Sequence, residues 1–388
     1  MKEDRISIRK NIRKYGMLIA LIAIMILFGI LTEGILFKPM NISNLIQQNA
    51  YVLILAIGML LVIITGNIDL SVGSVVAFVG AISAIFMIQW NMPVWISIIL
   101  SLLIGALVGA FQGFFIAYVN IPPFIVTLAG MLIFRGLTMV ILKGQTLGPF
   151  DRAFQNIASG FISRGEIGGF NVISMVVGIL LSVIYIILNF KDRKKKIEYK
   201  FQVPPMSIEI LKTVLVILAI NWLTYSLAAY KGLPIVLIIL AILIVIYSFI
   251  TNRTIAGRHI YALGGNEKAA KLSGIKTEKV LFWVYVNMGV LAALAGLVVA
   301  GRLNAATPKA GTGFELDAIA ACYIGGASAS GGIGTVTGAI VGGLVMGVLN
   351  NGMSILGIGV DWQQAIKGLV LLAAVTFDVY TKSKSRTQ

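Results

Sequence analysis

The fold class follows from residues 51–70, which read YVLILAIGMLLVIITGNIDL. No charged residue interrupts the run up to residue 64, after which the helix-breaking segment Thr65-Gly66-Asn67 precedes a single acid, Asp69. Apolar runs of about 20 residues are typical of helices that cross a bilayer, whereas the strands of membrane barrels alternate over about 10 residues. The stretch therefore predicts a transmembrane helix followed by a break.

The composition extends this interpretation to the whole chain. Of the 388 residues, 58% are apolar and 12% are charged, and the mean hydropathy is +0.96. A soluble domain carries about 25% charged residues, so a water-soluble globular protein is excluded and an all-α polytopic membrane protein is predicted. The only cysteine, Cys322, and the only histidine, His259, cannot provide a disulfide framework or a His/Cys metal site, and no metal is expected.

The apolar runs predict about twelve transmembrane spans, at residues 17–32, 44–65, 70–90, 94–119, 124–142, 170–190, 209–230, 234–251, 280–301, 314–330, 332–350 and 362–380. Span 314–330 is the weakest, because it is rich in Gly, Ala and Ser and begins with two acids. Twelve crossings put four basic segments on one side, near residues 2–14, 191–200, 253–279 and 382–386. Lys and Arg concentrate in cytoplasmic loops, so both termini are predicted to be cytoplasmic.

Two parts of the chain resemble each other. Thr65-Gly66 precedes Asp69, Thr312-Gly313 precedes Glu315, and Gly105-Ala-Leu-Val-Gly109 matches Gly338-Ala-Ile-Val-Gly342 in four of five residues. The predicted spans place the two parts in opposite orientations, as in transporters built from inverted repeats with broken helices. Chance similarity of small-residue runs is the alternative, in which these glycines serve only helix packing.

Charges inside predicted spans are functional candidates because they are costly in lipid. Asp69, with Asn67 and Ser71 beside it, can cap the start of a helix or bind an ion, and the cap is favoured. Glu315 and Asp317 begin a span near the outer face. Arg135 can extend to the membrane surface or act in the pathway, and the sequence leaves both possibilities open.

Residues 252–279 are too polar to span the membrane. Within them, Asn266 can cap a short helix that begins at Glu267 and ends before Gly274, with Ala269, Ala270 and Leu272 as its small apolar face. A helix lying on the lipid surface is one interpretation, and a helix that docks into a partner is the other. The small apolar face favours the partner.

The spacing Glu267-x-Ala269-Ala270-x-x-x-Gly274 resembles the coupling motif of ABC importer permeases. Residues 65–74, 261–275 and 310–321 resemble the ribose/xylose/multiple-monosaccharide branch, and residues 123–136 resemble its xylose-type members. The resemblance implies contact with an ATPase through a set of nine residues: Gly257, Arg258, Gly264, Gly265, Asn266, Glu267, Ala269, Ala270 and Gly274. Asn67, Asp69, Ser71, Arg135, Glu315 and Asp317 are the gate or pathway candidates.

The resemblance also implies an organisation. It consists of a cytoplasmic N-terminus 1–16, a first transmembrane half 17–190, an inserted basic loop and helix pair 191–251, a coupling loop 252–279, a second half 280–381 and a tail 382–388. The insertion departs from ribose-type permeases, which resemble this chain without residues 191–250 and have ten spans. It fits the xylose-like and multiple-sugar members, and its expected role is peripheral packing.

In that family the permease is a type II importer subunit of the bacterial inner membrane. The resemblance implies a homodimer, two ATPase subunits and an extracytoplasmic sugar-binding protein. The chain contains no Gly-x-x-x-x-Gly-Lys-[Ser/Thr] phosphate loop, so ATP is expected to be used by the partner, and the chain is expected to bind no cofactor and to catalyse no reaction. The alternative is an ion-coupled secondary transporter with Asp69 and Glu315 as coupling carboxylates.

Overall fold

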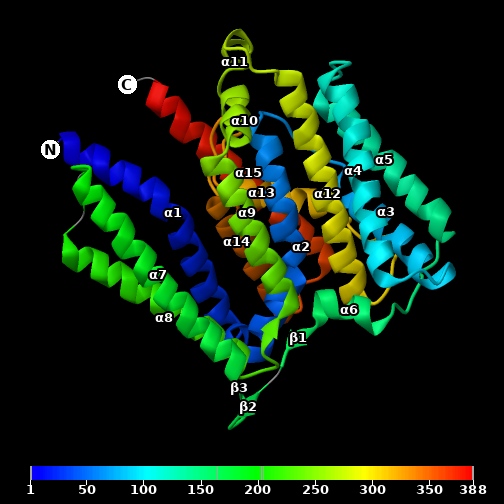
Figure 1. Ribbon diagram of the computed structural model, residues 1–388, viewed down its shortest axis with the longest axis horizontal. Helices are drawn as coiled ribbons and strands as arrows, with labels where there is room; N and C mark the ends of the chain where they lie inside the picture. The colour runs from blue at the N-terminus through cyan, green and yellow to red at the C-terminus, as the bar shows by residue number, and fades with distance from the viewer. Residues whose placement is uncertain (1, 164, 202, 204, 387–388) are drawn as a thin grey trace. The chain divides into compact units, whose positions relative to one another are not determined.

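The computed structural model describes residues 2–163, 165–201, 203 and 205–386 (Figure 1). Helices make up most of the chain, which confirms the all-α class. They are α1 (Lys2–Leu31), α2 (Pro39–Ile64), α3 (Val72–Ala84), α4 (Val94–Ala117), α5 (Pro123–Leu142), α6 (Arg152–Ser159), α7 (Val172–Glu198), α8 (Met206–Ala228), α9 (Ile235–Arg253), α10 (Ile255–Gly265), α11 (Glu267–Leu272), α12 (Thr277–Leu303), α13 (Phe314–Ile324), α14 (Val336–Ile355) and α15 (Val360–Arg386).

The remaining regular structure of the described residues is short. A 3₁₀ turn (Ile35–Phe37) precedes α2, and a π-helical turn (Ile85–Gln89) continues α3. Four two-residue strands, β1 (Phe161–Ile162), β2 (Glu166–Ile167), β3 (Phe170–Asn171) and β4 (Leu233–Pro234), form the antiparallel pairs β1–β4 and β2–β3.

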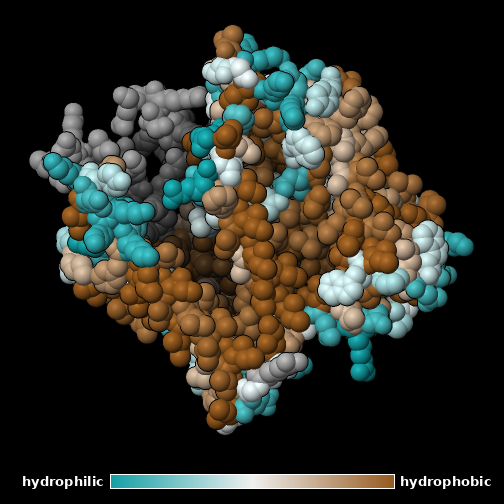
Figure 2. Space-filling model, viewed as in Figure 1, coloured by the Kyte–Doolittle hydropathy of each residue, from teal (hydrophilic) through white to brown (hydrophobic). Residues whose placement is uncertain are grey.

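Within the described residues, nine helices are long and apolar enough to cross a membrane: α2, α3 with its π turn, α4, α5, α7, α8, α9, α12 and α14. The apolar part of α1, Gly16–Leu31, is shorter, and α15 covers the predicted span 362–380. Hydrophobic side chains dominate the surface over α9 and α12 (Figure 2). The predicted span 314–330 is wrong as a single crossing helix. Only 11 residues of it, in α13, are helical, which gives a length of about 16 Å against a hydrocarbon core of about 30 Å.

The chain divides into two compact units. The first contains residues 1–36, 45–159 and 236–388, and the second contains residues 37–44 and 160–235. This division differs from the expected insertion at 191–251, because α9 belongs to the first unit while α8 pairs with α7 in the second. The basic segments at 2–14 and 382–386 lie in α1 and α15, outside the part of the chain whose side chains are described.

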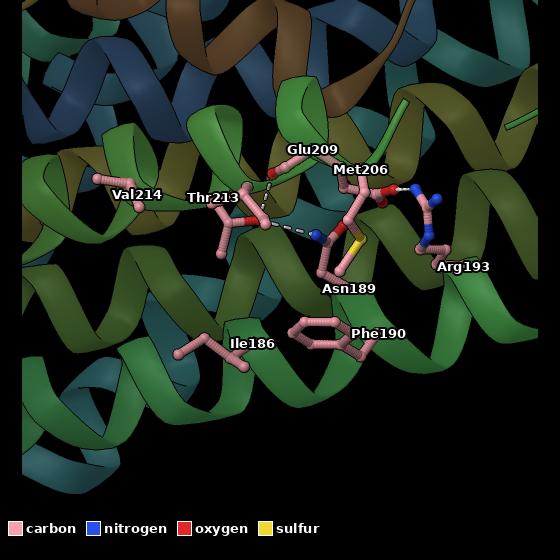
Figure 3. Close-up of a pocket in the computed structure, with 9 residues that line it drawn as sticks. Ile186, Asn189, Phe190, Arg193, Met206, Glu209, Thr213 and Val214 are labelled. Carbon is pink, nitrogen blue, oxygen red and sulfur yellow. Dashed lines mark hydrogen bonds and ion pairs between the residues drawn. The ribbon is translucent and has the colours of Figure 1, made fainter. Parts of the chain in front are cut away.

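The second unit is built on the antiparallel hairpin of α7 and α8, which a ladder of polar side chains holds together. Asn221 donates to Ser182 at 2.8 Å, and Asn189 donates to Thr213 at 3.0 Å. Arg193 pairs with Glu209 at the end of the ladder (Figure 3). Such bonds between membrane helices contribute about 0.6 kcal/mol each on average. The ladder explains why α8 pairs with α7, which the apolar pattern alone did not reveal.

The first unit contains the inverted repeat. The order α2, break, α3, α4, α5 recurs as α12, break, α13, α14, α15. The end of α2 lies against α10 while α12 begins just after α11, so the two leading helices run in opposite directions (Figure 1). Each repeat packs on the leading helix of the other: Gly105 and Gly109 of α4 contact α12, and Gly343 and Gly347 of α14 contact α2. The reciprocal packing confirms the inverted repeat.

Candidate functional site

The two breaks of the repeat meet at the starts of α3 and α13. The Cα of Gly73 lies so close to the Gly311 carbonyl that a Cβ at either glycine would overlap the backbone of the other. Gly311 also has a φ of +70°, which favours glycine. The Glu315 carboxylate lies against Gly73 as well. Glu315 therefore lies at the contact between the starts of α3 and α13.

Asp69 organises the first break. Its Oδ1 accepts hydrogen bonds from the Ser71 backbone N at 2.8 Å and from Ser71 Oγ at 2.6 Å. Gln112 of α4 donates to Ser71 Oγ at 2.8 Å, and Asp69 and Ser71 are both buried. The N-cap residue of α3 is Ser71, so the expectation that Asp69 itself caps the helix is replaced by a tight turn just before it. Asn67 bonds Thr65 within the same break.

Asp317 organises the second break through an ion pair. Lys367 of α15 lies 3.0 Å from Asp317 Oδ1, and the Tyr51 hydroxyl of α2 donates to Oδ2 at 3.0 Å. The Tyr51 ring also stacks on Phe314, with ring centroids 3.7 Å apart. Asp317 thus ties α13 to α15 and to the leading helix of the other repeat. Because the Asp317 side chain is 1% exposed, the loss of its cation would leave a buried charge.

Arg135 holds the loop between α12 and α13. Its Nη1 donates to the carbonyls of Pro308 at 2.9 Å and Ala310 at 2.6 Å. The alternative in which Arg135 only extends to the membrane surface is therefore wrong, because its guanidinium bonds the backbone of the second break. Arg135 connects α5 of the first repeat with the segment that leads into Glu315.

The short helix of the coupling segment folds as the sequence predicts, and a further helix, α10, precedes it. Thr254 caps α10 by accepting from the Gly257 N–H at 3.2 Å, and Asn266 caps α11 by accepting from the Ala269 N–H at 3.0 Å. Gly274, with a φ of +82°, follows α11 and reverses the chain. Gly257 is buried against the end of α9, and Arg258 is exposed. The helix pair therefore has a defined start and end.

This helix pair is attached to both repeats. Gly264 packs directly on the Ile64 carbonyl at the end of α2, which allows no side chain at that position. The same Ile64 carbonyl accepts the Gly332 N–H at 2.8 Å, and the Tyr261 hydroxyl donates to Gly334 O at 2.6 Å. Burial raises the pKa of Tyr261. A displacement of α10 would thus act on the first break and on the loop before α14 together.

The exposed apolar face of α11 differs from the predicted face at one residue, Ala270. Ala270 is buried, whereas Leu272 is 89% exposed and Glu267 and Ala269 are exposed. The six-residue helix turns Ala270 inward, so its apolar contact surface is formed by Leu272 and Ala269. Lys271 bonds Glu278 at 2.6 Å, and this hydrogen bond raises the pKa of Lys271.

Comparison with known proteins identifies the family. The family described as "Branched-chain amino acid transport system / permease component" matches residues 41–375. The chain belongs to this permease family. It is 39% identical to the xylose transport system permease of Haemophilus influenzae, over 96% of this chain and 98% of that protein. It is also 39% identical to the xylose transport system permease of Escherichia coli K12, over 97% and 94% of the two chains.

The ribose import permease of Bacillus subtilis is 35% identical over 97% of this chain and 96% of its own length. No solved structure was found to match the chain. The resemblance to ribose and xylose permeases noted in the sequence is confirmed. The family description and the names of the relatives refer to different cargoes, so family membership alone does not identify the substrate.

Sequence reasoning missed three polar residues of the permease junction: Tyr51, Gln112 and Lys367. Each lies within a predicted span, and Lys367 satisfies the rule for intramembrane charges that selected Asp69. Applying that rule to span 362–380 would have found it. Tyr51 and Gln112 carry no such signal, because uncharged polar residues are common in helices that pack on one another. Among the described residues, no group of three or more His, Cys, Asp and Glu comes together.

Proposed function

We propose that this permease is the membrane subunit of an ATP-driven ABC importer for monosaccharides, with a pentose such as xylose as its cargo. The names of its relatives, two xylose permeases and a ribose permease, support a sugar as the cargo. In this proposal the junction of α3 and α13 lies on the translocation pathway, and Asp69, Glu315 and Arg135 hold its gate elements.

One observation carries the proposal: α10 and α11 form a capped, exposed helix pair bonded to both repeats. An ion-coupled transporter has no use for such an attachment. In an ABC importer, an ATPase that binds α11 through Leu272 and Glu267 would transmit its closure through Gly264 and Tyr261 to both breaks. ATP belongs to that partner, and the permease needs no cofactor of its own.

The assembly we propose is a homodimer of this chain, the closed two-fold arrangement that is commonest among soluble oligomers. Two ATPase subunits bind its cytoplasmic side, and a soluble sugar-binding protein delivers cargo on the other side. The chain lies in the bacterial inner membrane with both termini and α11 in the cytoplasm. In the first unit, α11 and the described ends of α1 and α15 lie toward the same end (Figure 1).

The test is affinity purification of the tagged permease from native membranes, combined with uptake of labelled pentoses and hexoses in a deletion strain. Leu272→Glu changes an exposed side chain, so it should leave the fold intact while lowering both the co-purified ATPase and the uptake at least about tenfold. Ile167→Glu is the matched control, because Ile167 is 74% exposed and lies in the β2 strand, away from α11 in the sequence. Equal co-purification and uptake in both variants would contradict the proposal.

The second candidate is the ion-coupled transporter, which the burial of Asp69 and the position of Glu315 at the junction would serve. It predicts that uptake stops when the ion gradient is dissipated at constant ATP. The ATP-driven importer predicts the reverse: uptake continues without the gradient and stops when ATP is depleted.

A further inference from the structure

A large cavity lies beside the coupling segment in the first unit. Its volume is about 610 Å³, and α9, α10 and α12 supply its walls. The walls are mainly apolar and include Ile250, Ile255, Ile260, Val280 and Trp283. Ligand sites in proteins have volumes of about 300–1,000 Å³, so the cavity is large enough for a substantial part of a lipid-sized ligand.

Basic side chains also line this mainly apolar cavity. Lys276, just before α12, Lys279 of α12 and His259 of α10 line it, and none of its described lining residues is acidic. Glu278, which lies between the two lysines in the sequence, bonds Lys271 instead. The cavity therefore combines an apolar wall with uncompensated positive charge, which complements a molecule with an anionic head and an apolar tail.

A second observation points to a ligand. Asn287 lines the cavity, and its Oδ1 accepts a hydrogen bond from the Tyr247 hydroxyl. Its Nδ2 is buried and has no acceptor among the described residues. A buried donor without an acceptor is costly, so an oxygen atom of a bound molecule would stabilise it. The ester and glycerol oxygens of a phospholipid are acceptors of this kind.

We propose that this cavity binds one anionic glycerophospholipid from the surrounding membrane. Its phosphate would lie at Lys276 and Lys279, an acyl chain along Ile250 and Val280, and an ester oxygen near Asn287. Basic pockets between membrane helices at the cytoplasmic surface bind acidic headgroups in this way. Hydrophilic side chains gather around α10 and α11 and hydrophobic ones over α9 and α12, which gives the surface of the first unit the same polarity as such a lipid (Figure 2).

The position of the cavity gives the lipid a role. Gly274 and Ile275, which end the coupling segment, and Leu61, near the end of α2, also line it. A lipid there would hold α10 in place against α2 and α12, whether or not an ATPase is bound. Lipid binding requires only that this end of the first unit lies at the membrane surface. It does not depend on which cargo the permease transports.

The test uses the full-length permease, purified in mild detergent and examined by native mass spectrometry, followed by titration with phosphatidylglycerol or phosphatidylcholine in nanodiscs. The wild-type chain is expected to retain a phosphatidylglycerol-type lipid. The double variant Lys276→Gln/Lys279→Gln should bind phosphatidylglycerol about 30-fold more weakly, since each lysine near an anionic headgroup contributes about fivefold. Ala256→Phe, which adds bulk at the cavity wall without changing charge, should reduce binding independently.

Lys268→Gln/Lys309→Gln is the matched control, because it removes two exposed lysines that do not line the cavity. It should bind phosphatidylglycerol like the wild type, and inorganic phosphate should not compete. Equal binding in all variants, or equal affinity for phosphatidylcholine, would overturn the proposal. A crosslink from residue 279 to a second copy of the chain or to the ATPase, in place of lipid, would also overturn it. The lipid-binding measurements need neither the ATPase nor uptake, so the lipid and transport proposals can fail separately.

Discussion

At the residue scale, the ion pair of Asp317 and Lys367 is the interaction whose loss should destabilise the permease most clearly. Lys367→Met removes the cation and leaves a carboxylate with 1% of its side chain exposed. Breaking a buried pair in this way costs about 3–5 kcal/mol. We expect a clearly lower thermal unfolding temperature in detergent and a loss of uptake.

The compensating variant separates charge from packing in this pair. Asp317→Asn combined with Lys367→Met removes both charges and keeps an acceptor for the Tyr51 hydroxyl, so the unfolding temperature should recover most of its loss. A double variant as unstable as Lys367→Met alone would show that the lysine acts through packing, and the ion-pair interpretation would fail.

Asp69 supports a second prediction at this scale. Its Oδ1 accepts two bonds from Ser71, and an asparagine carbonyl can accept the same bonds. Asp69→Asn should therefore keep most of the uptake, whereas Asp69→Ala should lose about 1 kcal/mol of stability, as the removal of a helix-start acceptor does. Thermal unfolding and uptake check both variants. Complete loss of uptake in Asp69→Asn, with normal unfolding, would mean that the negative charge itself is required.

How much of the site the sequence predicts depends on the range of each interaction. The cap at Asn266 and the stop at Gly274 were predicted, because a cap and its helix lie within four residues of each other. The partners of Asp317 come from α2 and α15, 266 and 50 positions away. No local pattern encodes such pairs. The inward turn of Ala270 was also unpredictable, since it depends on how α11 packs.

At the scale of the element, α10 meets the end of α2 through direct backbone contact. A methyl group at Gly264 would overlap the Ile64 carbonyl, and neither backbone can shift without moving a helix. Gly264→Ala should therefore destabilise the contact by about 1–3 kcal/mol and lower the ATP-dependent uptake. Uptake per membrane-inserted permease, together with thermal unfolding, measures both effects.

Gly265→Ala is the neighbouring control, because a Cβ there meets nothing within 4 Å. It should transport sugar and unfold like the wild type. If the two alanine variants behave alike, the contact of Gly264 with α2 has no part in coupling, and the transmission route through α10 would have to be abandoned.

The elements also show where hydropathy misleads. Residues 314–330 are apolar enough to resemble a span, yet α13 ends at Ile324 and a loop follows. A hydropathy window averages over the glycines at 325, 326, 331 and 332 and does not register the end of a helix. The first repeat gives no warning of this, because α3 continues into its π turn and is long enough to cross the membrane, whereas α13 has only 11 residues.

At the scale of the whole molecule, the arrangement of the first unit makes the orientation testable. The proposal places α11 in the cytoplasm and the loop after α5 outside. The native Cys322 is buried, so it should not react with a membrane-impermeant thiol reagent. Lys268→Cys in α11 and Gln145→Cys after α5 each add one exposed thiol. In intact cells or spheroplasts, only Gln145→Cys should be labelled, and in inverted vesicles only Lys268→Cys.

The labelling also tests the path of the chain through the second repeat, because the predicted span 314–330 is not a single crossing helix. The helix α13 is too short to cross the membrane alone. The basic segments therefore lie on one side only if α13 and the following loop, which ends at Gly334, together bring the chain to the side of α11. The bond from Tyr261 to Gly334 O and the contact of Gly332 with Ile64 O require that placement. Labelling of Lys268→Cys from outside would reverse the proposed orientation and leave α11 unable to reach an ATPase.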